Sequence, residues 1–103
     1  MTAPYDCFSR ACKAYGLPVP EREYRFHPSR KYRADYAFVP QKILVEVEGG
    51  IYAGGRHVRG QGYENDLEKY NAAAMHGWLL LRYTPRRLLD AIPEIAEALA
   101  SRA

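Results

Sequence analysis

Residues 42–50 constrain the fold of this chain more than any other stretch, because two carboxylates interrupt an apolar strand pattern there. Aliphatic side chains at positions 43, 44, 45 and 47 predict a strand in the core. Glu46 and Glu48 lie two residues apart, so a strand places both side chains on one face. Gly49 and Gly50 then end the strand and allow backbone or ligand to approach closely. Because buried carboxylates are costly unless they are neutralised, a metal ion is one expected partner.

The preceding stretch, residues 32–39, supplies a third carboxylate in a second strand pattern. Pro40 and Gln41 predict a hairpin with either a two-residue loop or a four-residue loop over 39–42. Both loops put Asp35 opposite Glu46, with Cβ atoms about 4.5–5.5 Å apart. Asp35, Glu46 and Glu48 then form an oxygen-rich cluster of the kind that Mg²⁺ prefers. The opposite face is expected to be core: Tyr36, Phe38, Ile43, Val45 and Val47.

The same register also allows a plainer interpretation of the carboxylates. Arg33 would face Glu48, so the three acids could be exposed or salt-bridged surface groups. Metal binding is the interpretation that we favour, because Asp35 and Glu46 lie inside apolar strands.

The length of 103 residues predicts a single domain, 1–103, with one modest core. No apolar run approaches about 18 residues, and the N-terminus lacks a signal-peptide pattern. A cytoplasmic protein that makes no membrane contact is therefore expected. Cys7 and Cys12 are five residues apart on a predicted helix, which favours two buried thiols over a disulfide or a zinc site.

The net charge of +3 is mild, but the basic residues flank the acidic stretch on both sides. Those before it alternate with aromatic residues: Arg22, Tyr24, Arg25, Phe26, His27, Arg30, Lys31, Tyr32 and Arg33. Those after it lie in a Gly-rich segment: Arg56, His57 and Arg59. This distribution suits a polyanion held over metal ions, and a solvated basic surface is the alternative.

The remaining patterns predict helices around the hairpin. A helix is expected at about 4–15, a strand at 21–26, a Gly-rich loop at 49–65 and a strand at 78–83. Asn65 or Asp66 is expected to cap a helix that ends near His76 and buries Leu67, Tyr70, Ala74 and Met75. Pro93 predicts a short turn before a last helix at about 91–101. The fold class is α/β (α+β): a mixed sheet with an antiparallel hairpin and flanking helices, in which 78–83 runs parallel to 43–48.

Several motifs in this order carry a family resemblance. They are Arg-Ala-Asp-Tyr-Ala-Phe at 33–38, Val-Glu-Val-Glu-Gly-Gly at 45–50, Gly-Gly-Arg-His at 54–57, Asp-Leu-Glu-Lys-Tyr-Asn at 66–71 and Gly-Trp-Leu-Leu-Leu-Arg at 77–82. Together they resemble the PD-(D/E)XK nuclease superfamily, in particular its very-short-patch-repair-like and virus-type replication-repair groups, which phages often carry. The resemblance implies a restriction-endonuclease-like core and, if phage-encoded, a location in the bacterial host cytosol.

By the same resemblance, Asp35 and Glu46 are metal ligands for Mg²⁺ or Mn²⁺, and Val47 contributes its carbonyl oxygen. The chain departs from the family at Glu48, where a Lys is usual; Glu48 is then another metal ligand or a general base. Lys69 on the following helix is the expected substitute cation, the alternative being a solvent-facing Lys.

The other expected contacts follow from charge and position. His57 is a candidate base or phosphate contact, and Arg82 either pairs with an acid of the site or lies on the surface. The expected DNA contacts are Arg25, Arg30, Lys31, Arg33, Arg56, Arg59 and Gln61.

These expectations lead to a divalent-metal-dependent DNA endonuclease, with branched, nicked or mismatched DNA in phage or bacterial repair or recombination as its expected setting. A homodimer would allow it to cut both strands. The main alternative is a nuclease-fold DNA-binding module without catalysis, for which Glu48 is the chief argument. A small structural or regulatory protein is a third possibility.

Overall fold

The structure, a computed structural model, describes residues 6–49 and 61–103. Its elements are α1 (Cys7–Ala14), β1 (Glu21–Arg25), β2 (Arg33–Phe38), β3 (Ile43–Val47), α2 (Gln61–Met75), β4 (Leu79–Tyr83), α3 (Pro85–Leu88), the 3₁₀ helix η3 (Leu89–Ala91) and α4 (Ile92–Ser101). Within these residues four strands form one sheet in the order β1-β2-β3-β4. The pairs β1–β2 and β2–β3 are antiparallel, and β4 runs parallel to β3. The predicted mixed sheet with flanking helices is confirmed at this level.

The hairpin of β2 and β3 has the predicted register. Phe38 pairs with Ile43 and Tyr36 pairs with Val45, so one further step places Asp35 beside Glu46. The N–H of Lys42 donates to the carbonyl oxygen of Val39 at 3.0 Å, which closes a four-residue turn over 39–42. Because β2 ends at Phe38 and β3 begins at Ile43, the loop comprises residues 39–42, which is the four-residue alternative.

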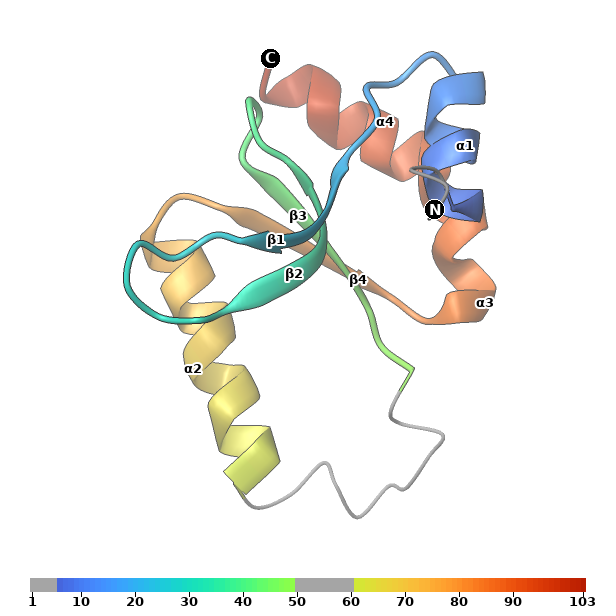
Figure 1. Cartoon of the computed structure of the whole chain (residues 1–103). Coiled ribbons are helices and arrows are strands. Elements are labelled where there is room, and N and C mark those ends of the chain that lie inside the picture. Colours follow the sequence, from blue (N-terminus) through green and yellow to red (C-terminus); the bar gives the residue numbers. More distant parts are fainter. Residues whose placement is uncertain (1–5, 50–60) are drawn as a thin grey trace, which may run out of the picture.

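Helices cover both faces of the sheet, as Figure 1 shows: α2 lies on one side, and α1, α3 and α4 lie on the other. The face under α1 and α4 is an apolar core built mainly from Phe8, Cys12, Tyr36, Phe38, Ile43, Val45, Ile92, Ile95 and Leu99. Val47 packs against this core and is partly buried, so the predicted core face of the hairpin is confirmed. A smaller apolar cluster lies under α2 and consists of Phe26, Ala34, Ala37, Leu44, Ala73 and Trp78.

Side-chain and backbone features mark both ends of α1 and the start of α4. The Asp6 carboxylate accepts the Ser9 N–H at 2.8 Å and caps α1, and Gly16 takes a φ of +89° just after that helix. Pro93 lies in the first turn of α4, where a missing N–H does no harm, and η3 separates α4 from α3. No described helix is long and apolar enough to cross a membrane.

The two thiols differ from the prediction in one respect. Both cysteines are free, and Cys12 is buried, but Cys7 is exposed because it lies on the outer side of α1. Burial, together with the negative charge of Asp6, raises the pKa of the Cys12 thiol to about 11. Cys12 therefore behaves as a small core side chain.

Two predictions about α2 are wrong. The helix begins at Gln61 rather than at Asn65 or Asp66, so residues 61–65, which were predicted as loop, are helical. Gly62 lies in the first turn, and Glu64 in the same turn suits the positive end of the helix dipole. The buried face is also different: Leu67 is 44% exposed and Met75 is 86% exposed.

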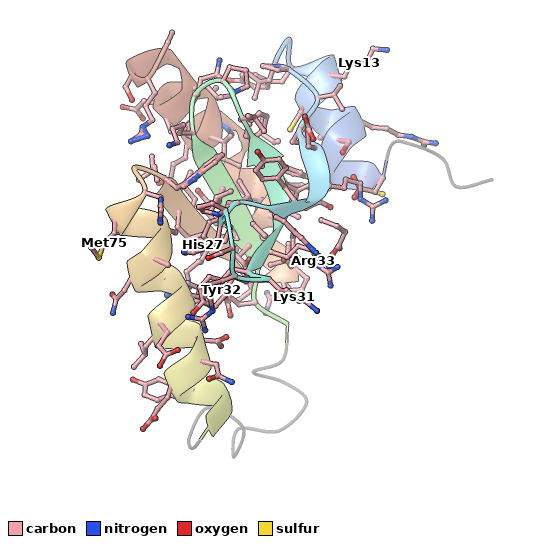
Figure 2. The ribbon with its side chains drawn as sticks, turned by 60° about the vertical axis from the view of Figure 1, so that its left-hand side comes forward. Lys13, His27, Lys31, Tyr32, Arg33 and Met75 are labelled. Carbon is pink, nitrogen blue, oxygen red and sulfur yellow. The ribbon has the colours of Figure 1, made fainter. Side chains whose placement is uncertain are left out.

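The side of α2 that faces the sheet has a mixed character. Ala73 is fully buried, Lys69 and Tyr70 are half-buried, and Ala74 is exposed. The N-terminal half of the helix extends beyond the sheet (Figure 1), and Met75 points away from it (Figure 2). The helix therefore does not pack on the sheet through the predicted apolar stripe. Lys69 and Tyr70 instead contact the carboxylates of the sheet.

Candidate active site

The sheet face under α2 changes from apolar to polar along β3. Leu44 is fully buried in the apolar cluster, Glu46 two residues later is 8% exposed, and Glu48 is half-buried. Strand β4 shows the same change, from Leu80 in the cluster to an exposed Arg82. Because β3 and β4 are parallel, both polar ends meet at the same edge of the sheet.

Asp35 joins this edge from β2. Its Oδ2 accepts the N–H of Val47 at 2.7 Å, a bond between residues twelve positions apart. The carboxylate is thus held against the Glu46–Glu48 segment of β3 by a charge-assisted hydrogen bond. This contact brings the first two predicted metal ligands, Asp35 and Glu46, to one place.

Lys69 reaches the carboxylates from α2. Its Nζ lies 2.7 Å from Glu46 Oε2, and the two side chains are 19% and 11% exposed. Burial raises the pKa of Glu46 above its ordinary value; the hydrogen bond and charge of Lys69 oppose this rise, and the charges of Asp35 and Glu48 add to it. Burial therefore disfavours the ionised form of Glu46, and Lys69 offsets part of that cost.

Glu48 has a different set of partners. The Tyr70 hydroxyl donates to its Oε2 at 3.0 Å, and Arg82 Nε donates to the same oxygen at 3.2 Å. The Arg82 guanidinium lies 4.3 Å from the centroid of the Tyr70 ring. Burial and the charge of Glu48 raise the pKa of the Tyr70 hydroxyl, so it remains a donor at neutral pH.

These contacts separate correct from incorrect sequence predictions. Of the two predicted roles for Arg82, pairing with an acid of the site is the one observed. Arg33 does not face Glu48 as an ion-pair partner; its Nε lies 3.2 Å from Glu23 on the neighbouring strand. Tyr70 was predicted as a core residue, and its role at the site was missed. The available signal was its position next to Lys69 on the helix that follows the acids.

Four of the predicted cationic DNA contacts, those from β1, β2 and the loop between them, lie beside this site. Arg25 and Arg33 are paired across β1 and β2, and Arg30 and Lys31 lie in the connecting loop. Figure 2 shows Lys31, Tyr32 and Arg33 together at this end of the sheet, near α2. The Arg30 guanidinium lies 4.7 Å from the centroid of Tyr32.

The loop and α2 line a hollow next to these cations. Its volume is ≈ 440 Å³, and its walls are Ser29, Arg30, Lys31, Tyr32, Asn65 and Glu68. Arg30 forms a loose ion pair with Glu68 across it, at 3.9 Å. The cations are exposed, so this surface is open to a large polyanion.

Three predicted site residues, Arg56, His57 and Arg59, lie outside the described residues. Gln61 is the first residue of α2, and its side chain is likewise outside the described part. Their expected roles stay predictions. The rings of His27 and His76, to which no function was assigned, meet edge to face with centroids 4.8 Å apart, and His27 Nδ1 accepts the N–H groups of Ser29 and Arg30.

The chemistry of the donor set decides whether a divalent ion fits. In residues 6–49 and 61–103 no three His, Cys, Asp or Glu side chains form a ready metal-binding group. Asp35 and Glu46 nevertheless provide two carboxylates close together, and the Val47 carbonyl lies between Glu46 and Glu48. Mg²⁺ is usually bound by one or two carboxylates and keeps several waters. The residues present therefore fit Mg²⁺ or Mn²⁺ once the hydrogen bond between Lys69 Nζ and Glu46 Oε2 is broken.

Comparison of the chain with family models, with curated proteins and with solved structures found no match. What can be said of function therefore depends on the geometry of this site and on the motifs that the sequence carries.

Proposed function

We propose that the protein is a divalent-metal-dependent DNA endonuclease that hydrolyses phosphodiester bonds. The observation that carries this proposal is the placement of Asp35 and Glu46 together at one edge of the sheet, with Lys69 Nζ 2.7 Å from Glu46. Two carboxylates beside a Lys, next to a cationic surface, suit hydrolysis of a polyanion. The motif resemblance to the PD-(D/E)XK superfamily agrees with this arrangement.

In this proposal, Asp35, Glu46 and the Val47 carbonyl hold Mg²⁺ or Mn²⁺. When bound, such an ion lowers the pKa of a coordinated water and stabilises negative charge on the phosphate. Lys69 moves its ammonium group from Glu46 to the phosphate, a shift that its flexible stem allows. The buried setting of Glu46 strengthens each of these electrostatic contacts.

The cations at the end of the β1–β2 hairpin hold the DNA backbone. Arg25, Arg30, Lys31 and Arg33 are exposed, and they lie where the chain leads into Asp35. Contacts of this kind position the substrate and make binding depend steeply on salt. They do not specify a sequence, which agrees with recognition of DNA structure such as a branch, a nick or a mismatch.

The test is cleavage of labelled duplex, single-stranded, nicked, mismatched, flap and four-way-junction DNA in Mg²⁺, in Mn²⁺ and in EDTA. Wild type is compared with Glu46→Gln and with the matched control Glu97→Gln, which changes an exposed carboxylate on α4 at the other face. We expect metal-dependent cutting by wild type and by Glu97→Gln, and a loss of at least 100-fold in Glu46→Gln.

Two other outcomes would reject the proposal. DNA binding without cutting in any metal would indicate the catalytically inactive DNA-binding module. Equal cutting by wild type and Glu46→Gln would indicate a contaminating nuclease or another site.

A further inference from the structure

We infer that Glu48 holds Arg82 in place instead of binding the metal, and that Arg82 contacts the phosphate of the substrate. This inference rests on the proposed function and assigns roles to two residues of the same site. It replaces the expectation that Glu48 is a metal ligand or a base. It also makes Arg82 a catalytic residue and Glu48 and Tyr70 its positioning residues.

The carboxylate of Glu48 is hydrogen-bonded to residues of α2 and β4. Tyr70 and Arg82 both donate to Oε2, at 3.0 and 3.2 Å, from α2 and β4 respectively. The Glu48 N–H donates to the Tyr83 carbonyl at 2.7 Å, so the backbone of Glu48 is tied to β4 as well. Glu48 is thus turned toward β4 and α2, whereas Asp35 is bonded to Val47 on the side of β2.

The guanidinium of Arg82 lies near the proposed metal ligands and is held by its neighbours. Arg82 is the register partner of Glu46 on the parallel neighbour β4, so it lies beside the proposed metal ligand. Its Nε is used by Glu48, and its guanidinium stacks on the Tyr70 ring at 4.3 Å. Among the described residues its two terminal nitrogens have no partner, and the side chain is 50% exposed. A guanidinium held at one edge and on one flat side presents its other edge for bidentate contact with a phosphate.

The charge of residue 48 agrees with this assignment. A Lys at position 48 would repel Arg82, whereas Glu48 attracts it and fixes its orientation. Arg82 therefore supplies, from the next strand, positive charge of the kind that a Lys on β3 would bring. With Lys69 on α2, the site then has cations from two elements around one phosphate position.

The first experiment measures Mn²⁺ affinity of the full chain by electron paramagnetic resonance, without DNA. Wild type, Glu46→Gln and Glu48→Gln are compared, each checked for folding by circular dichroism. We expect Glu46→Gln to lose at least tenfold in affinity and Glu48→Gln to change it less than threefold. A tenfold loss in Glu48→Gln would make Glu48 a ligand and overturn the inference while leaving the proposed function intact.

The second experiment measures DNA affinity in EDTA by fluorescence anisotropy over a range of salt. We expect Arg82→Ala to weaken binding at low salt by about 5–10-fold and to reduce the salt slope by about one. Arg82→Lys should restore part of the slope. The control Arg10→Ala changes an exposed Arg on α1, at the opposite face, and should leave affinity within twofold.

Glu48→Gln gives the sharpest result in the same assay. Removing a carboxylate from a DNA-binding surface ordinarily strengthens binding, because it removes repulsion. If Glu48 positions Arg82, the substitution instead weakens binding by two- to fivefold. A rise in affinity, or an unchanged slope in Arg82→Ala, would overturn the inference. Failure of wild type to bind Mn²⁺ at all would instead reject the proposed function.

Discussion

The two faces of the sheet are built on opposite principles. Under α1 and α4, side chains from β2 and β3 are apolar and almost completely buried, as Phe38 and Ile43 show. Under α2, the apolar cluster gives way to Glu46, Lys69 and Glu48 at one end. The same two strands therefore hold a core on one side and a set of buried or half-buried charges on the other.

The two faces contribute differently to stability: apolar burial under α1 and α4 stabilises the fold, whereas burial of charge under α2 costs free energy. Burial of apolar area on the first face stabilises the fold by about 25 cal/mol per Å². On the second face, burial works against Glu46 and raises its pKa, and the Lys69 partner offsets only part of that cost. Such an arrangement is expected at functional sites, where charges are kept in a low-dielectric setting.

The largest predicted effect is on the apolar face. Phe38→Ala should lower the free energy of unfolding by about 3–5 kcal/mol, because the side chain is 2% exposed and the cavity cannot refill. Urea denaturation measures the loss. The Mn²⁺ affinity of the molecules that remain folded should be unchanged. A loss below about 1 kcal/mol would mean that this face is not the main core.

A smaller loss is predicted when the charged contact on the other face is broken. Lys69→Met keeps the aliphatic stem but leaves the Glu46 carboxylate without its 2.7 Å partner, at a cost of about 2–3 kcal/mol at pH 7. The cost should shrink as the pH is lowered, because protonated Glu46 carries no charge for the Lys69 ammonium group to neutralise. Lys31→Met, at an exposed position in the β1–β2 loop, is the control and should have almost no effect. A cost that is independent of pH would contradict the role of this ion pair.

The pH dependence of stability sharpens the comparison further. The folded pKa of Glu46 is raised above the ordinary value of 4.5, mainly by burial, so folding favours the protonated form. The contribution of Glu46 to the free energy of unfolding is thus fully present below pH 4.5, and it is lost as the pH rises through the folded pKa.

Urea titrations of wild type and Glu46→Gln from pH 4 to pH 8 test this sign. The stability of wild type relative to Glu46→Gln should fall as the pH rises, by less than the Lys69→Met effect. A relative stability that rises with pH would show that Lys69 dominates and that the pKa is lowered.

The smallest predicted effect is at the outer side of α2. Met75→Ser should change the free energy of unfolding by no more than about 0.5 kcal/mol, because the side chain is 86% exposed. Ala73→Ser on the buried side of the same helix is the matched comparison and should cost more. If both variants lost the same free energy of unfolding, Met75 would be as buried as the helix periodicity predicted, which would contradict the structure.

The sequence was sufficient for the hairpin and its register. Side-chain alternation has a period of two, and both candidate turns led to the same pairing, so Asp35 had to meet Glu46. The gathering of Lys69 near the acids was also predictable, because the helix that follows β3 must cross back over the sheet before β4.

The errors arise where tertiary contact decides the outcome. Leu67 and Met75 fit a helical stripe, but α2 overhangs the sheet edge, so periodicity alone misplaces its buried face. Tyr70 and Arg82 converge on Glu48 only because of how α2 is rotated over β4, and no local pattern encodes that rotation. Arg33 likewise pairs with Glu23 on β1 and not with Glu48, a choice that depends on tertiary contacts and not on the local sequence.

The most direct test of the central claim, that the charged end of the α2 face is a divalent-cation site, is the thermal unfolding of wild type and Glu46→Gln with and without MnCl₂. A ligand that binds the folded state at roughly ten times its Kd adds about 1.4 kcal/mol, which is several degrees in Tm for a chain of this size. We predict this rise for wild type and little or none for Glu46→Gln. An unchanged Tm in wild type, or the same rise in both proteins, would contradict the account.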